Sequence, residues 1–292
     1  MQKIDHCILC NGSNFRIIHQ KDQWQYLRCL NCDLVSLHPR PTPQVLMKNY
    51  QDYLPVQPEE ISKWEIMMKP VFDKSADLIE SRTKSGRGGL LDIGCGYGFF
   101  LQEMKCRGWK VEGIEVSEVG RQFVREKWDI HVYSQPLEDL ALSENLFDVV
   151  TLFYVIEHVD DPLALLKEVN RILKPGGLVF LRWPHSTPII RILGPLSRKL
   201  DLYHTPYHLY DFSPRTMEKM LSYCGFREIK TMIKGNTRPS KRFNRWASVI
   251  FGGVGESVYY LSRRHFLLPG ISKTTLAIKP TEGLCQGNQT PI

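Results

Sequence analysis

The stretch Leu91-Asp92-Ile93-Gly94-Cys95-Gly96-Tyr97-Gly98 decides the fold of this chain. It follows an apolar run and precedes a segment with apolar residues at helical spacing, so the glycines lie where a buried strand turns into a helix. Glycines at such a turn permit a tight backbone and let a ligand lie against bare main chain. Gly94 and Gly96 fit a dinucleotide fingerprint, but Phe99 occupies the position of its third glycine.

An acidic residue at the end of the next predicted strand narrows the class of ligand. Glu115 lies about twenty residues after Gly96, where a carboxylate pairs with the vicinal hydroxyls of a ribose. The loop contains no basic residue and no Gly-Lys-Ser/Thr sequence that would hold a phosphate. The pattern therefore predicts a cofactor with a nucleoside but without a pyrophosphate.

Strand and helix patterns alternate along the rest of the chain. Alternation of this kind, with strands that are apolar along their whole length, predicts an α/β fold with a doubly wound, mostly parallel sheet. An earlier helix is predicted over 59–82, and Pro70 should end or kink it. The predicted strands are 90–93, 110–116, 130–133, 147–154, 178–183, 226–233 and 274–278, and the later helices are 97–106, 118–127 (capped by Ser117), 161–173 (ended by Lys174-Pro175-Gly176-Gly177) and 214–224.

At these motifs the chain resembles the class I S-adenosylmethionine-dependent methyltransferases. The resemblance covers roughly residues 86–233 and the final strand. It implies a seven-stranded, doubly wound Rossmann-like methyltransferase sheet, S-adenosyl-L-methionine as cofactor and methyl transfer as the reaction. The motifs that carry it, in their expected order, are Asp92 to Gly98, Glu115, Leu137-Glu138-Asp139-Leu140, Phe147-Asp148-Val149-Val150, Glu157-His158-Val159 and Leu173-Lys174-Pro175-Gly176-Gly177.

The resemblance also implies roles for individual residues. Asp92 would order the amino group of the cofactor, and Glu115 would bind its ribose. Relatives often carry an acid where this chain has Pro136, so we expect the contact with the adenine amino group to shift to Glu138. The implied cofactor-binding residues are Asp92, Gly94, Gly96, Gly98, Glu115, Val116, Leu137, Glu138 and, near the sulfonium, Phe153.

Four of the eight cysteines form two Cys-x2-Cys pairs near the N-terminus, Cys7 with Cys10 and Cys29 with Cys32. The separation of the pairs is typical of structural zinc sites, in which two tight turns supply a closed tetrahedron of thiolates. The alternatives are a redox pair or unrelated free thiols. A segment this short cannot fold by burial alone. We therefore predict a zinc ribbon over 1–40 with a structural, not catalytic, zinc.

These patterns predict how the chain is organised. The zinc ribbon is followed by a helical linker over 41–85 and by a methyltransferase domain over 86–280. That domain carries insertions at 184–213 and 234–270, and a tail covers 281–292.

Histidines are the candidate bases, because a hydroxyl acceptor must lose a proton. Ligands in this fold sit outside the carboxyl ends of the strands, where His158 and His185 follow predicted strands and His204 and His208 lie in the first insertion. We rank His208 first, then His185 and His204, and expect His158 to support the pocket. The alternative is that these rings only pack. Since the chain has neither an Asn-Pro-Pro-Tyr nor a Pro-Cys motif, a hydroxyl acceptor is favoured, with methylation of nitrogen or carbon left open.

The charge is unevenly distributed. The chain has 38 basic and 31 acidic residues, a net charge of +7, and the insertion 234–270 accounts for seven minus one, or +6, of it. This basic, aromatic stretch could lie on an anionic bilayer, hold an acidic substrate, contact RNA, form a dimer face, or be a solvated hairpin. No secretory signal and no membrane span are apparent, so we expect a cytoplasmic protein with a potential contact at the inner membrane surface.

The ribbon and the methyltransferase motifs together resemble a bacterial set that modifies sugars, polysaccharides, lipids and secondary metabolites. The stretches His38-Pro39-Arg40-Pro41 and His208-Leu209-Tyr210-Asp211-Phe212-Ser213 carry this resemblance, and isoprenoid-quinone O-methyltransferases share the core motifs. A small-molecule, sugar or lipid-linked acceptor is therefore expected. The alternatives are a ribosomal-RNA methyltransferase, whose zinc module would include a histidine, and a non-catalytic cofactor-binding protein. The sequence does not indicate an oligomeric state.

Overall fold

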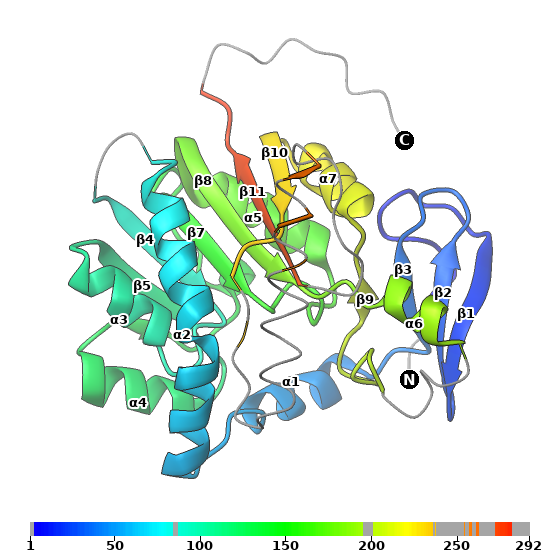
Figure 1. The fold of residues 1–292 in the computed structure, drawn as a ribbon, viewed down its shortest axis with the longest axis horizontal. Coiled ribbons are helices and arrows are strands. Elements are labelled where there is room, and N and C mark those ends of the chain that lie inside the picture. The colour runs from blue at the N-terminus through cyan, green and yellow to red at the C-terminus, as the bar shows by residue number, and fades with distance from the viewer. Residues whose placement is uncertain are drawn as a thin grey trace.

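The structure is a computed structural model that describes residues 3–83, 87–194, 201–235, 237, 254, 257–258, 261–262 and 272–281. In these residues the strands form two sheets, one of seven strands and one of four (Figure 1). The predicted insertion at 234–270 and the tail at 281–292 lie almost entirely outside the described residues. Within the described residues, no helix is long and apolar enough to span a membrane.

The large sheet confirms the predicted fold class. Its order is β10-β11-β8-β7-β4-β5-β6. The five strands from β8 to β6 are parallel, and β11 runs antiparallel to both of its neighbours. The strands are β4 (Gly89–Ile93), β5 (Lys110–Ile114), β6 (Val132–Tyr133), β7 (Phe147–Phe153), β8 (Leu173–Trp183), β10 (Arg227–Met232) and β11 (Lys273–Ile278).

Two apolar cores cover the two faces of this sheet, because successive strand residues point to opposite sides. Leu90 and Val149 belong to one core, with residues of α2 (Pro58–Glu80), α3 (Phe99–Cys106) and α4 (Glu118–Trp128). Their neighbours Leu91 and Val150 belong to the other core. That second core also contains residues of α5 (Pro162–Ile172), α7 (Pro214–Tyr223) and the cysteine-bearing segment.

Three local predictions need correction. Helix α2 does not end at Pro70, since Met68, Val71 and Phe72 on both sides of it continue one buried face. The helix before 174–177 ends at Ile172, close to its predicted end, but the following strand β8 begins at Leu173 and not at 178, because the main chain at Gly176 and Gly177 pairs with Lys279. Ser117 lies at the start of α4, but its side chain makes no capping hydrogen bond to the described residues.

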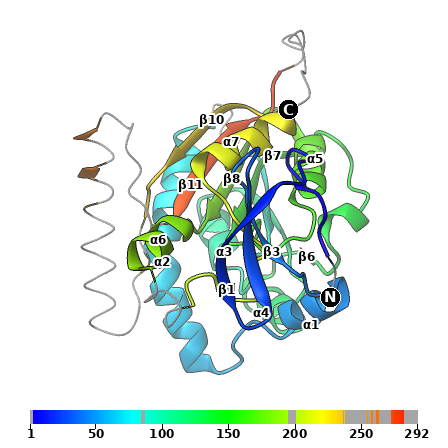
Figure 2. The ribbon, with the colours of Figure 1, turned by 90° about the vertical axis from the view of Figure 1, so that its right-hand side faces the viewer.

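The small sheet contains β1 (Phe15–Lys21), β2 (Trp24–Cys29), β3 (Val35–His38) and β9 (Tyr210–Asp211), paired antiparallel in that order. It lies beside the large sheet, on the right in Figure 1 and toward the viewer in Figure 2. Strand β9 comes from the predicted first insertion and pairs with β3 of the ribbon, so the two segments share one sheet.

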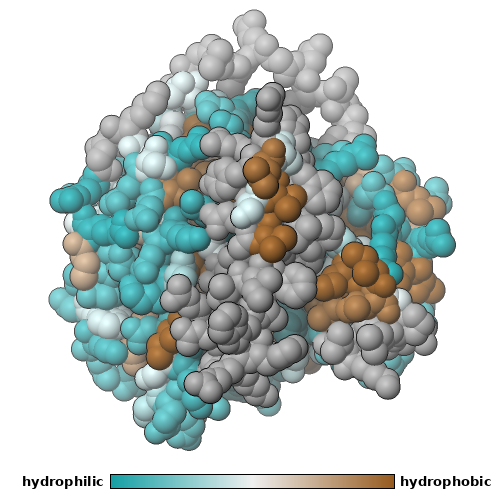
Figure 3. Space-filling model, in the orientation of Figure 1, coloured by the Kyte–Doolittle hydropathy of each residue, from teal (hydrophilic) through white to brown (hydrophobic). Residues whose placement is uncertain are grey.

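Sequence patterns did not predict β3, β9 or the helices α1 (Pro43–Gln51) and α6 (Thr187–Leu193). Helix α6 carries the exposed side chain of Ile192. Figure 3 shows apolar atoms gathered at this place on an otherwise mostly hydrophilic described surface.

Candidate functional site

The glycine loop that follows β4 requires glycine at several positions. Gly94, Gly96 and Gly98 have φ angles of +70°, +55° and +67°, a region that L side chains rarely adopt. A Cβ atom at Gly94 would lie 2.5 Å from Cγ2 of Val155. The loop therefore packs closely against the segment after β7, which contains Glu157 and His158.

Two buried carboxyl groups flank the loop. Asp92, at the end of β4, accepts a hydrogen bond of 2.6 Å from the Thr151 hydroxyl, and burial raises the pKa of Asp92 to about 8. Glu115, directly after β5, accepts hydrogen bonds of 2.8 Å from the main-chain N–H groups of Gly96 and Ser117. Burial raises the pKa of Glu115, while these N–H donors oppose the rise. Both groups can accept hydrogen bonds from an amino group or from ribose hydroxyls.

The connection between α1 and α2 covers the glycine loop. A Cβ atom at Gly96 would lie 3.7 Å from Trp64 and 3.8 Å from Leu54, and one at Gly120 would lie 2.7 Å from Leu54. The Tyr97 hydroxyl donates a hydrogen bond to the carbonyl of Pro55. The predicted linker thus packs against the glycine loop and supplies part of the wall of the candidate cofactor site.

The other predicted cofactor residues differ in how deeply they are buried. Leu137 and Glu138 form a short 3-10 helix, in which Leu137 is buried and burial raises the pKa of Glu138. Val116 is half-buried, just after β5. Phe153 packs in the core, with ring centroids 4.7, 5.2 and 5.3 Å from those of Phe100, Phe72 and Phe180. Its ring thus packs among these three aromatic rings at the carboxyl end of β7, and its contact with the sulfonium stays a prediction.

Two of the four candidate histidines meet at a carboxyl group. Atoms of His158, His208 and Glu157 that could bind a metal lie within 4.8 Å of one another. The His204 ring lies 5.0 Å from that of His208. Burial lowers the pKa of His158 to about 4 and that of His208 to about 2, so both rings are neutral at neutral pH.

His185 lies apart from this cluster, beside Trp183 at a ring separation of 6.0 Å. Its buried Nδ1 has no hydrogen-bond partner among the described residues, and burial lowers its pKa to about 3. Glu157 is not among the residues that the sequence analysis predicts for the site, yet it is fully buried in the cluster. The sequence could have indicated this role, because Glu157 stands directly before His158, just after the carboxyl end of a predicted strand.

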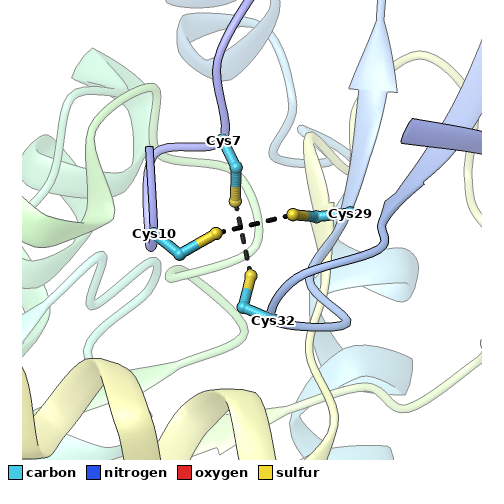
Figure 4. Close-up of side chains that lie close together, drawn as sticks. All are labelled: Cys7, Cys10, Cys29 and Cys32. Atoms are coloured by element: carbon cyan, nitrogen blue, oxygen red, sulfur yellow. Dashed lines mark hydrogen bonds between the residues drawn. The ribbon is translucent and has the colours of Figure 1, made fainter. Parts of the chain in front are cut away.

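The four N-terminal cysteines point toward a common centre (Figure 4). The Sγ atoms of Cys7 and Cys32 are 3.5 Å apart, as are those of Cys10 and Cys29, and all four lie within 4.8 Å of one another. A tetrahedron with Zn–S bonds of about 2.3 Å has edges of about 3.8 Å. The donor set and its spacing therefore fit a zinc ion with no open coordination position.

The ribbon makes direct contacts with residues 203–211, which contain His204 and His208 and are called the histidine segment below. The Tyr26 hydroxyl donates a hydrogen bond of 2.9 Å to the carbonyl of His208, and the Tyr26 ring stacks on Tyr203 at 3.9 Å. The N–H of Leu37 donates to the carbonyl of Leu209 at 2.9 Å. The cysteine-bearing segment is thus a wall of the candidate site.

A doubly wound seven-stranded sheet with a glycine loop after β4 and an acid after β5 defines a class I S-adenosylmethionine-dependent methyltransferase. The chain belongs to the methyltransferase domain family, whose model matches residues 64–231.

Known relatives agree with this assignment. A ubiquinone biosynthesis O-methyltransferase of Pseudomonas putida is 28% identical over 172 residues, which are 52% of this chain and 74% of the relative. A solved S-adenosylmethionine-dependent methyltransferase of Thermotoga maritima, described as a possible histamine N-methyltransferase, has the same fold, with a TM-score of 0.52, 20% identity and coverage of 80% of this chain and 99% of that one. Phosphoethanolamine N-methyltransferase 2 of Haemonchus contortus, solved with S-adenosyl-L-methionine, has a TM-score of 0.53 and 18% identity, covering 85% of this chain and 63% of that one.

Proposed function

We propose that this protein transfers the methyl group of S-adenosyl-L-methionine to a hydroxyl of a small molecule, sugar or lipid-linked intermediate. The observation that carries the proposal is the pair of buried carboxyl groups, Asp92 and Glu115, on either side of the glycine loop. The similarity to an O-methyltransferase of ubiquinone biosynthesis supports a hydroxyl as the acceptor.

On the cofactor side, the residues of this chain bind and orient S-adenosyl-L-methionine. Glu115 accepts hydrogen bonds from the ribose hydroxyls, and Asp92 pairs with the amino group of the methionine part. The cofactor supplies an electrophilic methyl group on its sulfonium. Because the displacement is in line, most of the rate comes from holding the acceptor oxygen on the axis of the bond that breaks.

On the acceptor side, the chain must remove one proton from the hydroxyl. The contact between Val155 and Gly94 places the segment that contains Glu157 and His158 next to the cofactor loop. Burial keeps the rings of His158, His208 and His185 unprotonated, so each ring has a nitrogen that can accept a hydrogen bond from a hydroxyl. The acceptor hydroxyl therefore lies at this histidine-lined edge.

We also propose that Cys7, Cys10, Cys29 and Cys32 hold one structural zinc ion. The support is the spacing of their four sulfur atoms. The ion would keep β2 and β3 folded, and these strands carry Tyr26 and Leu37 to the histidine segment.

Calorimetric titration of the zinc-loaded full chain with S-adenosyl-L-methionine tests the cofactor assignment. We expect saturable binding, and a folded sample that does not bind would overturn the proposal. The acceptor class is tested by incubating the protein and methyl-labelled cofactor with small-molecule and lipid extracts. Label in a methyl ether supports a hydroxyl acceptor, whereas label only in amines or at carbon contradicts it.

A further inference from the structure

Glu157, His158 and His208 converge from two parts of the chain. Glu157 and His158 follow β7, and His208 comes shortly before β9. Their potential ligand atoms lie within 4.8 Å of one another. Among the hydrogen bonds of the described residues, none joins these three side chains to one another.

The three side chains are close enough to share one ion. Around a divalent cation with bonds of about 2.1 Å, ligand atoms lie about 3.0 Å apart in an octahedron, about 3.4 Å in a tetrahedron, and about 4.2 Å when opposite. Ligand atoms that already lie within 4.8 Å of one another can therefore converge on a single ion.

Glu157 gives an independent indication that a ligand belongs there. Its side chain is 1% exposed, and neither carboxyl oxygen has a hydrogen-bond partner in the described part of the chain. A buried carboxyl group without any partner is costly, and native structures pair such groups or bind metal with them. A cation at the centre of the cluster would give the Glu157 carboxyl group the partner that it lacks.

The His158 ring is held as metal-ligating histidines usually are, and the main chain of both histidines is fixed by tyrosine hydroxyls. Nδ1 of His158 lies 2.9 Å from the carbonyl of Tyr207. Since a carbonyl only accepts, Nδ1 carries the proton and Nε2 keeps its lone pair. The Tyr50 hydroxyl donates to the carbonyl of His158 at 2.7 Å, and Tyr26 donates to the carbonyl of His208 at 2.9 Å.

We propose that Glu157, His158 and His208 bind one divalent transition-metal cation, of the class of Mn²⁺, Fe²⁺, Co²⁺ or Zn²⁺. Two imidazoles and one carboxylate suit these ions, and three protein ligands leave coordination positions open. This site differs in chemistry from the four cysteines, whose set is closed and made only of sulfur.

The open positions give the ion a role that rests on the proposed function. A cation at this edge binds the acceptor oxygen and lowers the pKa of its hydroxyl, which favours the oxyanion that attacks the methyl group. A histidine that ligates the ion cannot also accept the proton through the same nitrogen. His204, whose ring lies 5.0 Å from that of His208, would then take it.

Binding of Mn²⁺ tests the site, because Mn²⁺ prefers oxygen and imidazole ligands over thiolates and so avoids the cysteine set. The full chain with its ribbon zinc is titrated with Mn²⁺, and free Mn²⁺ is measured by electron paramagnetic resonance. We expect about one bound Mn²⁺ per chain, with affinity at least tenfold weaker in Glu157→Gln and in His208→Ala. The matched control His131→Gln removes a histidine elsewhere on the chain and should bind normally.

Titration of the same variants with S-adenosyl-L-methionine shows whether they remain folded and separates this proposal from the proposed function. Mn²⁺ binding that is absent, or unchanged in Glu157→Gln and His208→Ala, overturns the metal site even if the cofactor binds. Site-specific Mn²⁺ binding without cofactor binding supports the metal site and contradicts the methyltransferase reaction. If one variant unfolds, His158→Gln provides the same test.

Discussion

The hydroxyl of Tyr26, in a strand that ends at Cys29, one of the four proposed zinc ligands, donates a hydrogen bond of 2.9 Å to the main-chain carbonyl of His208. This single contact connects the proposed zinc site to the proposed acceptor site. The pairing of β3 with β9 adds a second connection, because it fixes Tyr210 and Asp211 to the ribbon. We therefore expect a change in the ribbon to affect the histidine segment more strongly than it affects the cofactor loop.

Tyr26→Phe should loosen the histidine segment and leave the cofactor site intact. The change removes the hydroxyl that donates to the carbonyls of His208 and Tyr203, at a cost of about 1–2 kcal/mol. Hydrogen exchange followed by mass spectrometry should show faster exchange over 203–211, with unchanged affinity for S-adenosyl-L-methionine. Tyr133→Phe, which loses one hydroxyl contact to Glu112 at the far sheet edge, is the control. Equal exchange over 203–211 in all three proteins would exclude the connection.

Cys29→Ser should release zinc and unfold the ribbon. Zinc binding supplies much of the folding free energy of so small a segment, so we expect about one zinc per chain in the parent protein and a clear loss in the variant. The variant should also show the faster exchange over 203–211 that Tyr26→Phe shows. Cys106→Ser changes an exposed cysteine and should keep both zinc and stability. A parent protein without zinc, or a variant that retains it, contradicts the assignment.

The features that were predictable from the sequence depend on neighbours along the chain. The glycine loop, the position of Glu115 and the two cysteine pairs are short patterns whose geometry is local. The seven-stranded order followed from resemblance to a known class of fold. Strand β9 was not predictable, because two residues form a strand only once the ribbon lies beside them.

The environment of Phe153 was predictable from strand periodicity. Strand side chains alternate with a period of two, so Phe153 shares a face with Val149, which lies in the core under α2 and α3. The role of Phe153 near the sulfonium comes from the resemblance alone and stays a prediction. The closeness of Glu157 to His208 depends on the docking of two distant segments, which no local pattern records.

The affinity for S-adenosyl-L-methionine should rise with pH in the neutral range. Burial raises the pKa of Asp92 to about 8, so below that pH its carboxyl group is mostly protonated in the free protein. The cationic amino group of the cofactor favours the carboxylate, and binding must therefore release a proton, which weakens affinity as the pH falls.

Calorimetry at about pH 6 and about pH 8, in buffers that differ in ionisation enthalpy, measures this proton release. Asp92→Asn should bind more weakly at about pH 8 and lose most of the pH dependence. Proton uptake in place of release would show that Asp92 does not pair with the amino group.

Glu115→Gln should weaken cofactor binding at least tenfold. The carboxylate now accepts from the N–H groups of Gly96 and Ser117, and a glutamine places an amide donor against one of those donors. The change therefore both removes a ribose acceptor and releases the loop at Gly96. Charge-assisted hydrogen bonds contribute about 1.5–3 kcal/mol each, which corresponds to roughly a tenfold to hundredfold change in affinity. Glu118→Gln, on the first turn of α4 with a side chain 68% exposed, should bind normally. Unchanged affinity in Glu115→Gln would mean that the ribose lies elsewhere, although the glycine loop itself would remain a feature of the fold.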